Sequence, residues 1–167
     1  MLKRPAGARI AVATALAVTA VAGSAVWYLT RPDGPALEPR FAADLISHVT
    51  PLIESKMTAD WSTRPARMGC AVKPVGTTPA DADTIAEVQA VYVWAGCQTL
   101  TPEGTATILP IGVHLTPAVT FDIPTDADWG TGQVTSMFPE QFHDLLLQGE
   151  HPAGLEAAMK QRVRELS

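Results

Sequence analysis

The hydrophobic pattern divides the chain into three kinds of segment, and the first is an uncharged run over residues 10–29 that follows three basic residues. A helix of about twenty residues spans about 30 Å, the thickness of the bilayer core. Basic residues before such a run place that side in the cytoplasm. The pattern predicts a cytoplasmic tail over residues 1–9 and a single-pass signal-anchor helix over residues 10–30, in contact with the lipid bilayer through residues 10–29.

A cleaved secretory signal is the alternative interpretation of this run. Ala20-Val21-Ala22 matches the small-x-small pattern that precedes a cleavage site, so cleavage near Ala22 would release a secreted protein. Trp27 and Tyr28 extend the apolar run past that point and suit the membrane interface, which favours a retained anchor. Both interpretations place residues 39–167 outside the cytoplasm. Residues 31–38 contain Pro and Gly and are predicted to form a linker.

The second kind of segment has a helical period and occurs on both sides of a central alternating region. Over Pro39 to Met57 the apolar residues recur at spacings of three and four and share one helix face: Phe41, Leu45, Val49, Leu52 and Ile53. Pro51 removes one backbone hydrogen bond, so a kink or a break is expected near Ser47 to Thr50. Two more helices are predicted, one from Pro139 to about Gly149 and one over Gly154 to Leu166.

The third kind of segment alternates with a period of two, which predicts strands. The clearest stretch, Ile85 to Leu100, is apolar on both faces, so we expect a central strand that is covered on both sides. A turn at Thr101 to Gly104 joins it to the next strand, in which Pro110 and Gly112 indicate a bulge or an edge. The other predicted strands are Gly69–Val75, Thr105–Leu115, Val119–Ile123 and a short return at Val134–Phe138.

This order of elements predicts an α+β domain over residues 39–167, built on an antiparallel sheet of about four strands. One helix precedes the sheet and two follow it. The order resembles that of the cystatin-like and nuclear transport factor-like folds, in which a helix packs against a curled sheet. Because only the order of elements carries this resemblance, it implies an architecture and no particular function.

The charge of the predicted domain argues against two classes of partner. From Leu37 onward there are 8 Lys and Arg and 16 Asp and Glu, a net charge of 8 − 16 = −8. Nucleic acids and anionic lipid surfaces both favour a basic protein face, so neither is an expected partner of this domain. The abundance of Ala, Thr and Pro is typical of a high-GC bacterial chain. The predicted setting is therefore a bacterial cell envelope, with an envelope protein as the expected partner.

The chain contains two cysteines, Cys70 and Cys97, and both lie in the part predicted to be exported. An even number of cysteines outside the cytoplasm is typical of disulfide bonding. The alternative, a redox-active pair, requires a CxxC spacing that is absent here. We predict one structural disulfide that holds the first strand beside the central one.

The loop predicted over Pro124 to Gln133 carries the candidate binding residues, Asp126, Asp128 and Trp129. Carboxylates can bind Ca²⁺, and a tryptophan in a Gly-rich loop is typical of a partner contact. A calcium-binding EF-hand loop needs a glutamate at its twelfth position, which is Met137 when counted from Asp126. No metal site is therefore predicted, and binding through these residues remains a hypothesis.

No catalytic residue and no cofactor are predicted. His114, His143 and His151 lack the spacings that preset a metal site, and the chain has neither a GxSxG nor an SxxK motif. Two classes of function stay open. The favoured one is a membrane-tethered binding or accessory module, and the alternative is a small extracytoplasmic hydrolase whose site is assembled across the sheet.

Overall fold

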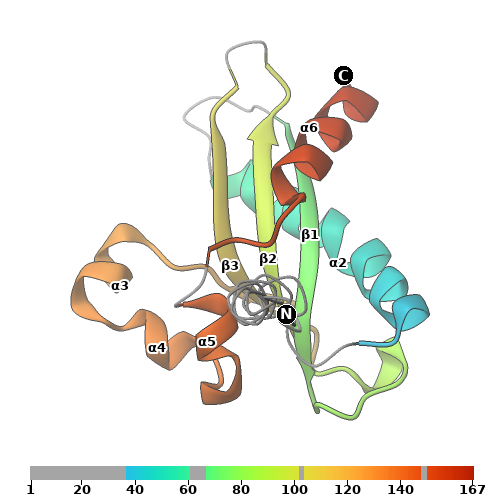
Figure 1. Ribbon diagram of the computed structural model, residues 1–167, viewed down its shortest axis with the longest axis vertical. Coiled ribbons are helices and arrows are strands. Elements are labelled where there is room, and N and C mark those ends of the chain that lie inside the picture. Colours follow the sequence, from blue (N-terminus) through green and yellow to red (C-terminus); the bar gives the residue numbers. More distant parts are fainter. Residues whose placement is uncertain (1–36, 61–66, 102–103, 148–149) are drawn as a thin grey trace, which may run out of the picture. The chain divides into compact units, whose positions relative to one another are not determined.

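A computed structural model describes residues 37–60, 67–101, 104–147 and 150–167 (Figure 1). The chain divides into two compact units, Met1–Pro32 and Asp33–Ser167, and all the described residues belong to the second. The predicted tail and membrane anchor, residues 1–30, lie outside the described residues. Among the residues that the structure describes, no helix has both the length and the apolar character needed to cross a membrane.

The second unit is built on a four-stranded antiparallel sheet, which confirms the predicted α+β class. The strands follow each other in the order β1-β2-β3-β4, and each pairs with its neighbour in the sequence. Every connection is therefore a local one, as expected for an antiparallel meander. Their bounds are Met68–Thr78 for β1, Ala90–Thr99 for β2, Ala106–His114 for β3 and Thr120–Asp122 for β4.

Strand β1 is longer than the sequence indicated, because it continues through Pro74 and Gly76. Its register with β2 shifts between these two residues, which leaves Val75 as an extra residue. β1 lies at the edge of the sheet. A proline whose missing N–H faces the open side of an edge strand costs no hydrogen bond of the ladder. The predicted strand ended at Val75, because the sequence does not show that Pro74 lies at a sheet edge, where a proline is tolerated.

One face of the sheet is covered by the long helix α2, Pro39–Asp60 (Figure 1). Its apolar stripe is buried as predicted and meets the side chains that β1, β2 and β3 direct to that face. Of the two expected alternatives the break is wrong, because α2 is a single helix that contains Pro51, and the kink stays a prediction. Ser47 and Pro51 are both exposed, so water can reach the carbonyl that loses its donor. The buried stripe of α2 comprises Phe41, Leu45, Val49, Ile53 and Met57.

The opposite face carries a second core built from the C-terminal segments. Tyr92 and Trp94 of β2 pack there against Phe138, Phe142 and neighbouring aliphatic side chains. The indole Nε1 of Trp94 donates to the backbone oxygen of Leu145 at 2.9 Å, so the buried ring keeps a polar partner. The prediction that the central strand is covered on both sides is confirmed.

The segments after the sheet differ from the prediction. The expected loop contains helix α3, Asp126–Thr131, and the expected short strand is helix α4, Val134–Met137. Val134 and Phe138 lie four residues apart and are both buried, a spacing that also fits one helix face. The predicted helix after Pro139 is divided into a 3₁₀ turn and a short helix, so more than two helical segments follow the sheet. These later elements are η2 (Glu140–Phe142), α5 (His143–Leu146) and α6 (Leu155–Leu166).

The stretch predicted as one central strand also begins differently. Its first residues form a 3₁₀ turn, η1 (Ile85–Glu87), and β2 starts only at Ala90. Thr84 and Glu87 form a capping box at η1, which gives these residues a local helical alternative to the strand. Strict alternation along a strand would place Val88 on the same face as Tyr92, but Val88 lies in the α2 core.

Of the two alternatives predicted at Pro110 and Gly112, a bulge or an edge, β3 shows an edge. Pairing between β2 and β3 runs without a register shift, so no bulge forms there. β4 pairs only with Gly112, Val113 and His114, and in the described part of the chain residues 106–111 of β3 pair on one side only. Pro110 lies in this half, where a missing N–H is tolerated.

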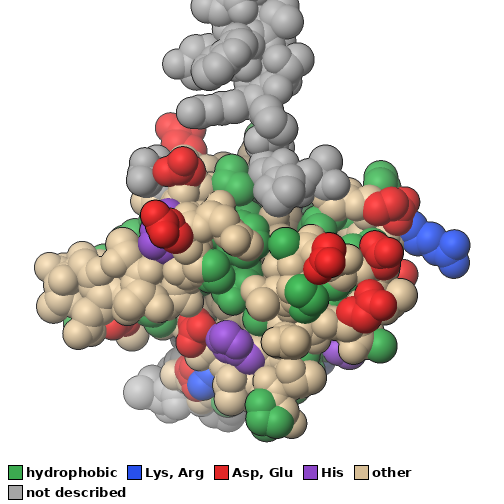
Figure 2. Space-filling view, turned by 90° about the horizontal axis from the view of Figure 1, so that it is seen from below, with side chains coloured by type: hydrophobic (Ala, Val, Ile, Leu, Met, Phe, Trp, Pro, Cys, Tyr) green, Lys and Arg blue, Asp and Glu red, His purple; other side chains and the backbone are tan. Residues whose placement is uncertain are grey.

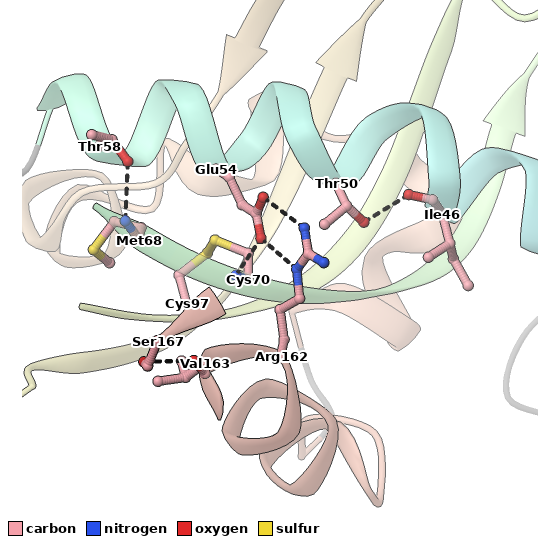
Figure 3. Close-up of polar contacts among 10 residues, drawn as sticks. All are labelled: Ile46, Thr50, Glu54, Thr58, Met68, Cys70, Cys97, Arg162, Val163 and Ser167. Carbon is pink, nitrogen blue, oxygen red and sulfur yellow. Dashed lines mark hydrogen bonds and ion pairs between the residues drawn. A yellow bond between two sulfur atoms is a disulfide. The ribbon is translucent and has the colours of Figure 1, made fainter. Parts of the chain in front are cut away.

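At the outer edge of β1, side chains of α2 accept backbone hydrogen bonds from the strand, and a side chain of α6 binds one of these α2 side chains. The N–H of Met68 donates to Thr58 Oγ1 at 3.1 Å, and the N–H of Cys70 donates to Glu54 Oε1 at 3.0 Å. Arg162 of α6 donates two hydrogen bonds to the Glu54 carboxylate, one from Nε (2.9 Å) and one from Nη2 (3.1 Å), as Figure 3 shows. This hydrogen bonding raises the pKa of Arg162. The two helices, which lie on opposite faces of the sheet, are thereby joined around its edge.

The predicted disulfide between Cys70 and Cys97 is present. The two residues are direct register partners on β1 and β2, and their Cα atoms lie 4.1 Å apart. Both side chains are buried beneath α2. The bridge therefore pins the edge strand to the central strand, as the sequence indicated.

Candidate functional site

The structure places the sequence-predicted binding residues in and around the first turn of α3. Asp128 is committed to the start of the helix, because its Oδ2 accepts hydrogen bonds from the N–H of Thr125 (2.8 Å) and from its Oγ1 (2.6 Å). The Thr125 hydroxyl, followed by its N–H, lowers the pKa of Asp128. This carboxylate stabilises a local helix start and is less available to a ligand than the sequence suggested.

Asp126 and Trp129 are exposed on the same short helix, with 44% of Trp129 accessible to solvent. The next residue, Gly130, has no other atoms within 4 Å of the position that its Cβ would take. The surface beside Trp129 is therefore open at Gly130. The structure does not gather three or more His, Cys, Asp or Glu side chains with the geometry of a metal site anywhere among the described residues.

The capping role of Asp128 predicts a pH-dependent loss of stability in Asp128→Asn. A carboxylate whose pKa is lower in the folded than in the unfolded state stabilises the fold above its unfolded pKa, about 3.9, and this contribution is lost as the pH falls through the folded-state pKa. We therefore expect the variant to have a lower melting temperature than the natural chain at pH 7, and the difference to vanish in strong acid. Asp126→Asn, in the same turn, is the control and should show a smaller difference at pH 7.

A pair that the sequence did not indicate lies where β3 meets β4. His114 Nε2 and Asp122 Oδ2 are 2.6 Å apart, and about a third of each side chain is exposed. Gly112 faces Asp122 across the ladder, and a Cβ at Gly112 would come within 3.3 Å of the Asp122 carboxylate. The absence of a side chain at Gly112 gives Asp122 the space to lean toward the imidazole.

The pair has the first two members of a hydrolytic constellation, a histidine and the carboxylate that orients it. In the described part of the chain no hydroxyl or thiol is hydrogen-bonded to His114, and both cysteines form the disulfide. In the structure the register of β3 with β4 puts residues 114 and 122 on one face of the sheet. That register depends on the 115–119 connection, which periodicity alone does not specify.

A hollow of the described domain that is partly open to solvent lies where α2 begins. It has a volume of about 360 Å³ and is lined by Leu37, Glu38 and Phe41 at the start of α2 and by residues 80–83 between β1 and β2. The start of α2 and this connection lie side by side at the lower right of Figure 1. Figure 2, which views this end of the domain, shows acidic side chains around apolar ones there.

Two carboxylates near this pocket are used to hold its walls. Glu38 Oε2 accepts the N–H of Phe41 at 2.9 Å and satisfies a free donor of the first turn of α2, which lowers the pKa of Glu38. Glu87 Oε2 accepts the N–H groups of Asp83 (3.0 Å) and Thr84 (3.2 Å) from the connecting loop, and these bonds lower the pKa of Glu87. The pocket walls are therefore fixed by local capping at both sides.

Asp81 and Asp83 remain available at the mouth of this pocket. Both residues are exposed, and neither carboxylate has a hydrogen bond or ion pair in the part of the chain that the structure describes. The pocket combines apolar walls, contributed by Leu37, Phe41 and two alanines, with these free negative charges. Asp81 and Asp83 lie in a segment of Thr, Pro, Ala and Asp that is typical of a turn, and nothing in the sequence indicates that this turn lies beside the start of α2.

No protein-family model matches this chain, and no curated protein or solved structure is significantly similar to it.

Proposed function

We propose that the chain is a membrane-tethered module that binds an envelope protein outside the cytoplasm of a bacterium and has no catalytic activity of its own. The observation that carries the proposal is the pocket at the start of α2, because it pairs apolar walls with carboxylates that no other described group engages. Such a concave site with few polar groups is typical of binding. The uncharged run over residues 10–29 supports the tether, and the Cys70–Cys97 disulfide supports an oxidising compartment.

The second candidate is a small extracytoplasmic hydrolase, and the His114–Asp122 pair favours it. A histidine oriented by a carboxylate can accept a proton from water and thereby generate a nucleophile. The pair lies at the sheet edge, and its residues do not line the pocket at α2. The two functions therefore depend on different residues and can be separated by substitution.

The proposed function is tested with the full chain in bacterial membranes. Carbonate extraction should leave the protein in the membrane pellet, and protease added from outside should digest residues 39–167. A soluble protein whose N-terminus is Gly23 would contradict the tether and establish secretion.

Incubation of the purified chain with isolated cell envelopes then separates the two candidates. A binding module should sediment with the envelopes without releasing soluble fragments, in the natural chain and in His114→Ala alike. Release of fragments that His114→Ala abolishes would establish the hydrolase and overturn the module.

A further inference from the structure

We propose that the pocket at the start of α2 receives one lysine or arginine side chain from an extended segment of the partner protein. The inference rests on the proposed binding function and adds the chemistry of the partner. It is carried by the form of the pocket, which is a hollow of about 360 Å³ with apolar walls and two unengaged carboxylates at its mouth.

The walls match the long stem of a basic side chain. Lysine and arginine bury their methylene groups along apolar surface while the charged head stays near water or a carboxylate. Leu37 and Phe41 provide such surface on the α2 side, and Ala80 and Ala82 provide it on the loop side. A short polar side chain would leave this apolar surface without a contact.

The charges at the mouth match the head group. Asp81 and Asp83 are exposed, and each can accept charge-assisted hydrogen bonds from an ammonium or guanidinium group. Arg40 is in the first turn of α2 but does not line the pocket. No basic side chain is therefore among the residues that line the pocket together with these carboxylates.

An anionic ligand would not fit the same place. A helix N-terminus is often an anion site, because its N–H groups are unpaired and its dipole is positive. At α2 this role is already filled by the chain itself, since Glu38 accepts the N–H of Phe41. A second anion would meet the exposed carboxylates of Asp81 and Asp83, whereas a cation is attracted by both.

A metal ion is also a poor occupant of this pocket. Divalent cations of the calcium type need six to eight oxygen ligands around them. Within the described residues, no three carboxylate or histidine groups converge with that geometry. A side chain that carries one charge at the end of an apolar stem uses both the walls and the mouth.

Titration of the full chain in an uncharged detergent with synthetic peptides tests the inference. The probe is acetyl-Ala-Leu-Lys-Leu-Ala-amide, and the matched probe carries norleucine, which has a similar stem without the charge, in place of lysine. We expect the lysine peptide to bind at least tenfold more tightly than the norleucine peptide. We also expect its affinity to fall with added salt, since the contact is partly exposed.

Paired substitutions locate the site. Asp81→Asn combined with Asp83→Asn should weaken binding of the lysine peptide at least fivefold. Asp144→Asn, which removes an exposed carboxylate on α5, should leave binding unchanged. All three positions are exposed, so each variant is expected to fold, which circular dichroism checks.

Four results would contradict the inference or the proposed function on which it rests. Equal binding of the lysine and norleucine peptides would show that the pocket does not select a cation. Equal effects of the loop pair and of Asp144→Asn would show that only overall charge matters. Cleavage of the bound peptide, detected by mass spectrometry, would instead contradict the proposed non-catalytic function. Absence of lysine-dependent binding to a chain that still sediments with envelopes would refute the inference alone.

Discussion

Gly76→Ala is expected to destabilise the domain by about 3 kcal/mol, because the added methyl group has no space. A Cβ at Gly76 would overlap ring carbons Cε1 and Cζ of Phe142, whose side chain is only 2% exposed. The Phe142 ring also packs against Tyr92, with ring centroids 5.1 Å apart, so it cannot move aside without disturbing the second core. Urea denaturation of the full chain in mild detergent measures the loss.

Two further variants show whether the clash with Phe142 is the cause. Gly130→Ala on α3 adds the same methyl group where nothing lies within 4 Å, so it should be neutral or stabilise by up to about 1 kcal/mol. Phe142→Leu removes the ring, and its cost combined with Gly76→Ala should be smaller than the sum of the two single costs. Strictly additive costs, or a neutral Gly76→Ala, would contradict the close approach of Phe142 to β1.

Loss of the Cys70–Cys97 disulfide should cost about 3 to 4 kcal/mol in the chain-entropy account, since the bridge joins residues 27 positions apart. This is a large part of the roughly 5 to 15 kcal/mol that stabilises a typical domain. The double variant Cys70→Ala and Cys97→Ala removes the bridge without leaving a free thiol. Urea denaturation of this variant should show a midpoint well below that of the natural chain.

Intact mass with and without reductant checks the bridge itself. The purified protein should gain the mass of two hydrogens on reduction, and reduction should lower its urea midpoint as the double substitution does. Two thiols that react freely with an alkylating agent before reduction, or a disulfide-linked dimer, would contradict the pairing of β1 with β2 through these residues.

Periodicity predicted the parts of the fold in which one residue pattern satisfies one structure. The apolar stripe of α2, with Phe41, Leu45, Val49 and Ile53, has a spacing that only a helix places on one face. The two apolar faces of β2 likewise required cover on both sides, which α2 and the second core provide. Both the stripe and the strand were therefore found from the sequence.

Periodicity failed where a local cap competed with the longer pattern. Thr125 with Asp128 starts α3 inside a segment that looked like a loop, and Thr84 with Glu87 starts η1 inside a segment that looked like a strand. Such caps satisfy backbone donors over only three residues, too few for a periodic signal. The break expected near Pro51 does not form, because Pro51 is exposed on α2, and its exposure depends on which helix face is buried.

The sequence by itself determined the α+β class, the central strand and the disulfide partners, because hydrophobic spacing and a single cysteine pair leave little choice. Only the tertiary structure decided which polar residues meet. Asp81 and Asp83 lie beside Phe41, and Asp122 beside His114, because the direction of α2 and the register of β3 with β4 bring them together. Such contacts join positions that no local spacing relates, since their proximity is produced by burying apolar side chains elsewhere in the domain.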